Sequence, residues 1–221
     1  MSQKLPANLA TNIMTMVDGF YTGKPKSGNK MYDINEAGVR QNQLVGAAAD
    51  KADRRWNNAQ EANSRLPAQR NTRARNGQNY LQYGRTLWTF QKGCGNCFER
   101  ACLAAYLARE LNVSNVFIGE ITTPGDHVFC LIGGSGAPWN SVEQMTGATT
   151  DAWVLDPWAA IACPAREYSV HFLDTLDTWT ARGMRIFFPD PATPNVARWV
   201  EPTNIDYANG FVYGPLAFTK L

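Results

Sequence analysis

Residues 91–111 read QKGCGNCFERACLAAYLAREL, in which a glycine-rich turn with two cysteines leads into a run of good helix formers. Asn96 stands where an N-cap residue is expected, and Glu99 follows three residues later, which is the spacing of a capping box. The stretch therefore predicts a helix over residues 97–111 with Cys97 as its first residue.

Short β-rich runs follow this helix at residues 115–121, 127–132, 152–155 and 184–188, with a further helix expected at 172–182. The run at 127–132 is apolar on both faces, which favours a central strand. A helix followed by several hairpin-like strands indicates an α+β fold with an antiparallel sheet.

The chain before the glycine-rich turn has a different composition. Spacing of apolar residues predicts helices at 8–20 and 35–63, with a loop at 22–31, a stop at Pro67 and an exposed linker over 68–79. Residues 1–92 carry 14 basic and six acidic side chains, a net charge of +8, whereas residues 93–221 carry seven and 13, a net charge of −6. We therefore expect a basic, polar, helical and partly flexible N-terminal region over residues 1–79 and a compact domain over residues 80–221.

Length and composition exclude several classes of protein. With 221 residues, 44% of them hydrophobic, the chain can bury a core without metal or disulfide staples and is too apolar to be wholly disordered. No apolar run approaches the roughly 18 residues of a membrane span, and the N-terminus lacks the pattern of a signal peptide. Five cysteines, an odd number, then favour reduced thiols.

Three kinds of site could use Cys94 and Cys97. The first is a redox dithiol, although the βαβ context of such motifs is missing upstream. The second is a zinc site of Cys94, Cys97, His127 and Cys130, which would make the chain a zinc-stabilised, non-enzymatic interaction module. The third is a thiol nucleophile, because the free N–H groups and the dipole of a helix N-terminus lower the pKa of a cysteine such as Cys97.

A thiol nucleophile needs a histidine and a group that orients it. Of the two histidines, His127 opens a predicted strand and can point into a cleft, whereas His171 is expected to be structural. Asp156 ends the strand at 152–155, so adjacent strands could place the Nδ1–H of His127 against its carboxylate. Asp126 and Asp151 are the alternative orienting groups.

The spacing Gln91-x-x-Cys94-Gly95-x-Cys97 resembles the motif around the nucleophile of papain-like cysteine peptidases. This resemblance implies that Cys97 is the nucleophile and that the Gln91 side chain donates to the oxyanion hole, together with the Cys97 backbone N–H. It also implies that His127 and Asp156 complete the triad in that order.

The sequence departs from papain in two respects: Phe98 replaces the tryptophan that follows the nucleophile, and the cysteine-to-histidine spacing is much shorter. We also expect Trp158, which flanks Asp156, and Asn96 to contact the substrate. No metal or cofactor is expected at a site of this kind.

Three motifs follow in order within residues 88–160, about a third of the chain: Gly-Asn-Cys-x-Glu-x-Ala at 95–101, Asp-His-Val-Phe at 126–129 and Val-Leu-Asp-Pro-Trp at 154–158. In these motifs the chain is more similar to the papain-fold domains of bacterial effectors and toxins. These domains include cysteine proteases and protein glutamine deamidases, with transglutaminases as distant relatives. The resemblance implies a thiol hydrolase that deamidates glutamine or cleaves a peptide bond in a protein substrate, with transglutaminase-type acyl transfer as an alternative.

The same resemblance implies synthesis in the bacterial cytoplasm and delivery into a target cell by a signal-peptide-independent secretion system. A secretion chaperone or a cognate inhibitor protein would then be a partner. Nucleic acid is not favoured as a partner, because acidic residues dilute the six arginines between positions 54 and 75.

Overall fold

The computed structural model describes residues 7–27, 30–41, 43–91, 93–122, 127–134, 139–190 and 193–221. The helices in these ranges are α1 (Ala7–Phe20), α2 (Gly46–Arg75), α3 (Tyr80–Phe90), α4 (Cys97–Glu110), α5 (Val142–Thr146), the 3₁₀ turn η1 (Ala165–Glu167), α6 (Tyr168–Ala181) and α7 (Ile205–Tyr213). The strands are β1 (Lys30–Tyr32), β2 (Val116–Ile121), β3 (His127–Ile132), β4 (Trp153–Asp156), β5 (Ile161–Pro164), β6 (Met184–Asp190), β7 (Thr193–Val200) and β8 (Leu216–Lys220).

Two antiparallel sheets organise the described residues. The larger has the order β5-β4-β3-β2-β8, and the smaller has the order β1-β6-β7. Strand β3 lies in the middle of the larger sheet and all its residues are buried, as its continuous apolar run predicts. The predicted α+β class with an antiparallel sheet is confirmed, while its papain-like character stays a prediction.

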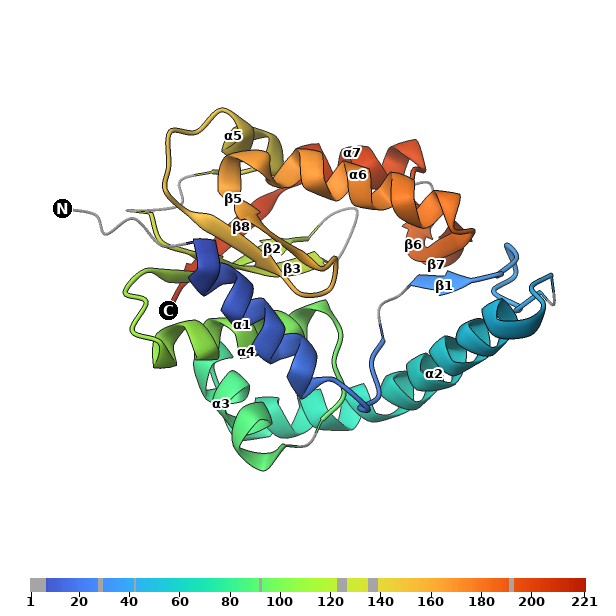
Figure 1. Ribbon diagram of the computed structural model, residues 1–221, viewed down its shortest axis with the longest axis horizontal. Coiled ribbons are helices and arrows are strands. Elements are labelled where there is room, and N and C mark those ends of the chain that lie inside the picture. The colour runs from blue at the N-terminus through green and yellow to red at the C-terminus, as the bar shows by residue number, and fades with distance from the viewer. Residues whose placement is uncertain are drawn as a thin grey trace.

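Helices cover both faces of the larger sheet. Figure 1 shows α1 and α4 on one face, with α3 packed on α4, and α5, α6 and α7 gathered on the other side. Helix α4 packs directly on β3, and ten of its 14 residues are buried. Helix α3 approaches α4 very closely, since a Cβ on Gly84 would lie 2.2 Å from the Cys102 carbonyl oxygen.

The N-terminal region takes part in the main core. Five side chains of α1 (Ala10, Ile13, Met14, Val17 and Phe20) are buried in the same cluster as α4 and the larger sheet. The predicted boundary near residue 79 therefore does not coincide with a break in this core.

The prediction that a helix ends at Pro67 and gives way to an exposed linker is wrong. Helix α2 runs from Gly46 to Arg75 with Pro67 inside it. A proline removes one helical N–H donor, but Gln69 and Arg70 in the next turn bond to the loop before α4 and to α4 itself, which supports the helix beyond the proline.

Within the described residues, no helix has both the length and the apolar character to cross a membrane. The structure describes all five cysteines, and none of them forms a disulfide with another.

Candidate active site

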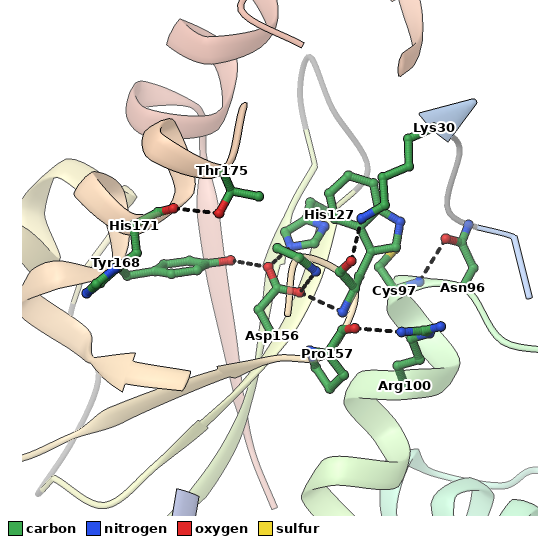
Figure 2. A network of polar contacts seen from close by, with 12 residues as sticks. Lys30, Asn96, Cys97, Arg100, His127, Asp156, Pro157, Tyr168, His171 and Thr175 are labelled. Carbon is green, nitrogen blue, oxygen red and sulfur yellow. Dashed lines mark hydrogen bonds and ion pairs between the residues drawn. The ribbon is translucent and has the colours of Figure 1, made fainter. Parts of the chain in front are cut away.

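Cys97, His127 and Asp156 come together at one end of the larger sheet (Figure 2). Helix α4 begins at Cys97, and the predicted capping box of Asn96 and Glu99 is present. The Cys97 thiol hydrogen bonds to the His127 imidazole, whose Nε2 lies 2.8 Å from Oδ2 of Asp156. The three predicted members of a triad therefore form one chain of hydrogen bonds.

The pairing of β3 with β4 explains this contact. The two strands are antiparallel with Cys130 opposite Leu155, so one further step places Asp156 beside Phe129. Side chains two residues apart on a strand share a face, which puts His127 on the same side. The prediction that Nδ1 meets the carboxylate is wrong, since Nε2 is the ring nitrogen that lies against Asp156.

The Asp156 carboxylate is fully buried and its charge is surrounded by donors. Besides His127, it accepts bonds from the backbone N–H groups of Trp158 and Ala159, both at 3.1 Å, and from the Tyr168 hydroxyl at 2.9 Å. Burial on its own would raise the pKa of Asp156, but the His127 charge and these hydrogen bonds hold it below its usual value. Asp156 is therefore an anion that fixes the orientation of the imidazole.

The His127 imidazole is stabilised in its charged form. Burial alone would lower the pKa of His127, but the Asp156 carboxylate and the Cys97 sulfur raise it to about 10. An imidazolium beside a cysteine favours the thiolate, which is the reactive form of that side chain. The pair can therefore supply a nucleophile and, from the same ring, a proton.

Trp158 forms one wall around this imidazole. Its ring centre lies 4.9 Å from that of His127, and only 7% of the residue is exposed. The rings of Phe172 on α6 and Phe211 on α7 lie within 6 Å of His127 as well. The predicted role of Trp158 in substrate binding stays a prediction, whereas its packing against the histidine is observed.

Lys30 is a member of the site that sequence analysis missed. Its buried ammonium donates to the Trp158 carbonyl oxygen at 2.5 Å and lies over the rings of Trp158 and Trp179, at 4.0 and 3.7 Å from their centres. Burial lowers the pKa of Lys30 well below its ordinary value, and the nearby Arg55 lowers it further. No local pattern marks a lysine in a polar loop as buried, so no signal in the sequence could have found it.

Helix α2 is bonded to the turn that precedes Cys97. The Gln69 side chain accepts from the Cys94 N–H at 2.9 Å and donates to the Cys94 carbonyl at 3.1 Å. In the next residue, the Arg70 guanidinium makes two bonds to the fully buried Glu99 carboxylate, at 2.7 and 3.1 Å. Glu99 also accepts from the Asn96 N–H, so these contacts reach the N-cap of α4 directly.

The segment that precedes β1 holds the same turn from another direction. The Ser27 N–H donates to the Gly95 carbonyl at 2.9 Å, and the Gly95 N–H donates to the Pro25 carbonyl at 3.3 Å. Gly95 has no room for a side chain, because a Cβ would lie 2.4 Å from the ring of the buried Tyr21. The turn before Cys97 is thus in contact with two parts of the N-terminal region.

Arg100 connects the helix that begins at Cys97 with the turn that follows Asp156. It lies one turn after Cys97 on α4, and its Nη1 donates to the Pro157 carbonyl at 2.6 Å. Because Pro157 follows Asp156, this bond links α4 to the turn that carries the carboxylate (Figure 2).

The predicted oxyanion-hole donors make local bonds instead. Gln91 is exposed in a left-handed conformation with φ 51°, and its Nε2 donates to the Trp88 carbonyl at 2.8 Å. The Cys97 N–H donates to Oδ1 of Asn96 at 2.8 Å. The structure therefore does not bring Gln91 to the other three residues, and the roles of Gln91 in the oxyanion hole and of Asn96 in substrate binding stay predictions.

The zinc site predicted as an alternative is not assembled. Cys94 packs in a small cluster with Ala62 and Leu66 of α2, while Cys130 is buried within β3. The described residues, which include all four predicted ligands, contain no group of three side chains that could hold a metal ion. The reason is that Cys94 faces α2 while Cys97 faces His127.

The remaining candidates lie elsewhere. His171 is exposed on α6, and its carbonyl accepts from Thr175. Asp151 precedes β4, and His127 bonds to Asp156 rather than to it. Asp126 lies outside the described residues.

Comparison of the chain with protein-family models, with curated proteins and with solved structures gave no match. The functional argument therefore rests on the geometry of the site.

Proposed function

We propose that this protein is a cysteine hydrolase that acts on amide bonds of a protein substrate. The observation that carries the proposal is the buried His127, which bonds to both Cys97 at the start of α4 and the Asp156 carboxylate. A helix N-terminus, an imidazolium and an anion behind it are the elements that activate a thiol.

In the proposed reaction, the Cys97 thiolate attacks the amide carbon and forms a tetrahedral intermediate. His127 then gives its proton to the departing nitrogen, so the C–N bond breaks and an amine or ammonia leaves. A water molecule, deprotonated by the neutral imidazole, attacks the thioester and releases a carboxylic acid and the thiol. Asp156 stabilises the imidazolium whenever it forms.

Proteolysis, glutamine deamidation and transglutaminase-type acyl transfer share these steps and differ in the nitrogen that leaves and in what resolves the thioester. All three stay within the proposal. Delivery into a target cell as an effector or toxin stays a prediction from the resemblance of the motifs.

Labelling of the native protein with iodoacetamide at neutral pH tests the activated thiol. We expect one fast-reacting site, located at Cys97 by peptide mass spectrometry, and loss of the fast phase in Cys97→Ala and His127→Ala. Cys94→Ala is the matched control, because Cys94 is buried in a separate cluster with α2, and should label like the wild type. Equal labelling rates in wild type and His127→Ala would overturn the proposal.

Mass spectrometry of a candidate partner protein after incubation assigns the reaction. A new peptide terminus indicates proteolysis, a one-dalton gain at glutamine indicates deamidation, and an amine adduct indicates acyl transfer. Cys97→Ala should produce none of these changes.

A further inference from the structure

A cavity of about 340 Å³ lies beside the triad, walled on one side by Pro157 and Trp158. The side chains that line it are strongly positive, and Asp18 is the single acid among them. The basic residues of this cavity, which we call the cationic pocket, are Lys26, Lys30, Lys51, Arg54, Arg55 and Arg100. They come from α2, from α4, from the segment before β1 and from the first residue of β1.

The positive charges of the cationic pocket are poorly compensated. Within the described residues, one ion pair involves a basic residue of the pocket: Arg100 with Asp18, at 4.0 Å. Burial lowers the pKa of Lys26, and the charges of Arg100 and Arg55 lower it further. Like charges held together in this way cost free energy, which a bound anion would recover.

Two buried donors that line the pocket have no partner. Nε of Arg100 and Nε1 of Trp158 are inaccessible to solvent and make no hydrogen bond, although both residues are more than nine-tenths buried. A buried donor without an acceptor is unfavourable, so an acceptor oxygen that reached either group would stabilise the complex. These donors point to acceptor oxygens as the missing partners.

The arrangement favours phosphate over a single carboxylate. Even without Lys30, whose pKa is lowered well below its ordinary value by burial, five basic side chains against one acid exceed the single charge that a carboxylate would neutralise. The guanidinium groups of Arg54, Arg55 and Arg100 present planar forks that match phosphate oxygens. The volume lies near the lower limit of small-ligand sites, about 300 Å³, and so suits one or two phosphoryl groups.

We propose that the cationic pocket is a binding site for a phosphoryl group, placed next to the Cys97–His127–Asp156 site. The phosphoryl group belongs either to a free small phosphate compound or to a phosphorylated side chain of the protein substrate. Binding requires no reaction at Cys97 and so stands independently of the proposed hydrolase activity.

Isothermal titration calorimetry on the full chain tests the site with two probes: inorganic pyrophosphate and a short peptide with one phosphoserine. We expect saturable binding of at least one probe and a rise in Tm of the protein on its addition. Tighter binding of pyrophosphate identifies a free phosphate compound, and tighter binding of the peptide identifies a phosphorylated substrate. Absence of binding of both probes at millimolar concentration would overturn the proposal.

Two double variants that remove the same number of positive charges distinguish binding in the pocket from non-specific attraction of an anion to a basic protein. Lys51→Gln/Arg54→Gln removes two exposed pocket cations and should weaken binding by about tenfold, because exposed charges attract an anion through interactions that solvent partly screens. Arg85→Gln/Arg182→Gln removes two exposed cations outside the pocket and should bind like the wild type. Equal weakening in both double variants would contradict the site.

Probe binding by a Cys97 variant tests the phosphoryl site separately from the hydrolase proposal. Cys97→Ala should bind the probe with the wild-type affinity, since Cys97 does not line the pocket. Failure of iodoacetamide labelling with intact probe binding would remove the hydrolase and leave the phosphate site.

Discussion

The two halves of the candidate active site are held by different parts of the chain. The half with His127 and Asp156 is fixed by the β3–β4 register and by the Tyr168 hydroxyl of α6. The half with Cys97 is fixed by Gln69 and Arg70 of α2 and by the segment that pairs with Gly95. The basic N-terminal region is thus part of the site, and its integrity should control the reactivity of the thiol.

Deletion of residues 1–79 is the strongest test of this comparison. We expect loss of cooperative unfolding, because the five buried side chains of α1 leave the core. Burial of a large apolar side chain is worth about 1.5–3 kcal/mol, so their sum approaches the whole stability of a domain, about 5–15 kcal/mol. Urea unfolding followed by tryptophan fluorescence measures this. A cooperative transition at the wild-type midpoint would show that the Cys97 half does not depend on the N-terminal region.

Asp156→Asn removes the carboxylate charge from the half of the site that contains His127, with little change in the shape of the side chain. The rate of thiol labelling at neutral pH should fall by roughly 10–30-fold, because a cysteine without an activating imidazolium is only a few per cent thiolate at pH 7. Asp151→Asn is the control, because His127 bonds to Asp156 rather than to Asp151. If Asp151→Asn slowed labelling as much as Asp156→Asn, the assignment of the orienting group would be wrong.

The protonated His127 should give stability a distinct pH dependence. The folded pKa of about 10 lies above the ordinary 6.5, so the stabilisation is complete below about pH 6.5 and disappears as the pH rises through about 10. The free energy of unfolding, measured from neutral pH to pH 10, should fall more steeply in the wild type than in His127→Gln. Parallel curves would contradict a raised pKa.

Arg70→Ala weakens the hold of α2 on the nucleophile turn. Glu99 is fully buried, whereas 44% of the Arg70 side chain is exposed. We therefore expect a destabilisation of about 1–3 kcal/mol, together with slower labelling of Cys97. Arg65→Ala breaks an exposed pair with Glu61 on the same helix and should cost less than about 1 kcal/mol. Equal losses in urea unfolding would contradict a special role for Arg70.

Gln91→Ala should have the smallest effect. Its side chain is exposed and bonds within its own turn, so labelling of Cys97 should stay within about twofold of the wild-type rate. A role in the oxyanion hole would instead appear in turnover of an amide substrate, as a loss of about 10²–10³ in kcat. An unchanged kcat would remove Gln91 from the mechanism.

The sequence predicts the parts of the site that local signals specify. Asn96 and Glu99 mark the start of α4, and the apolar run of β3 marks a central strand, so the sequence predicts that Cys97 begins a helix and that His127 begins a strand. Asp156 is found because a proline ends its strand. The positions of these three residues can be predicted from local sequence signals and the antiparallel pairing of two strands.

The rest depends on contacts between distant residues. Pro67 is a helix breaker by propensity, but the bonds of Gln69 and Arg70 to the α4 turn override it. The burial of Lys30 between two tryptophan rings depends on the arrangement of three elements. At Gln91 the local spacing matches the papain-like motif, but the side chain donates to the nearby Trp88 carbonyl and does not reach Cys97.

The contact between Gly95 and Tyr21 has a consequence for how related chains can diverge. Because a Cβ at position 95 would overlap the Tyr21 ring, the two positions cannot change independently. A descendant that keeps the tyrosine must keep the glycine, whereas one with a smaller residue at position 21 can admit alanine or serine at position 95. This pair therefore provides a covariation signature that joins the N-terminal region to the cysteine motif.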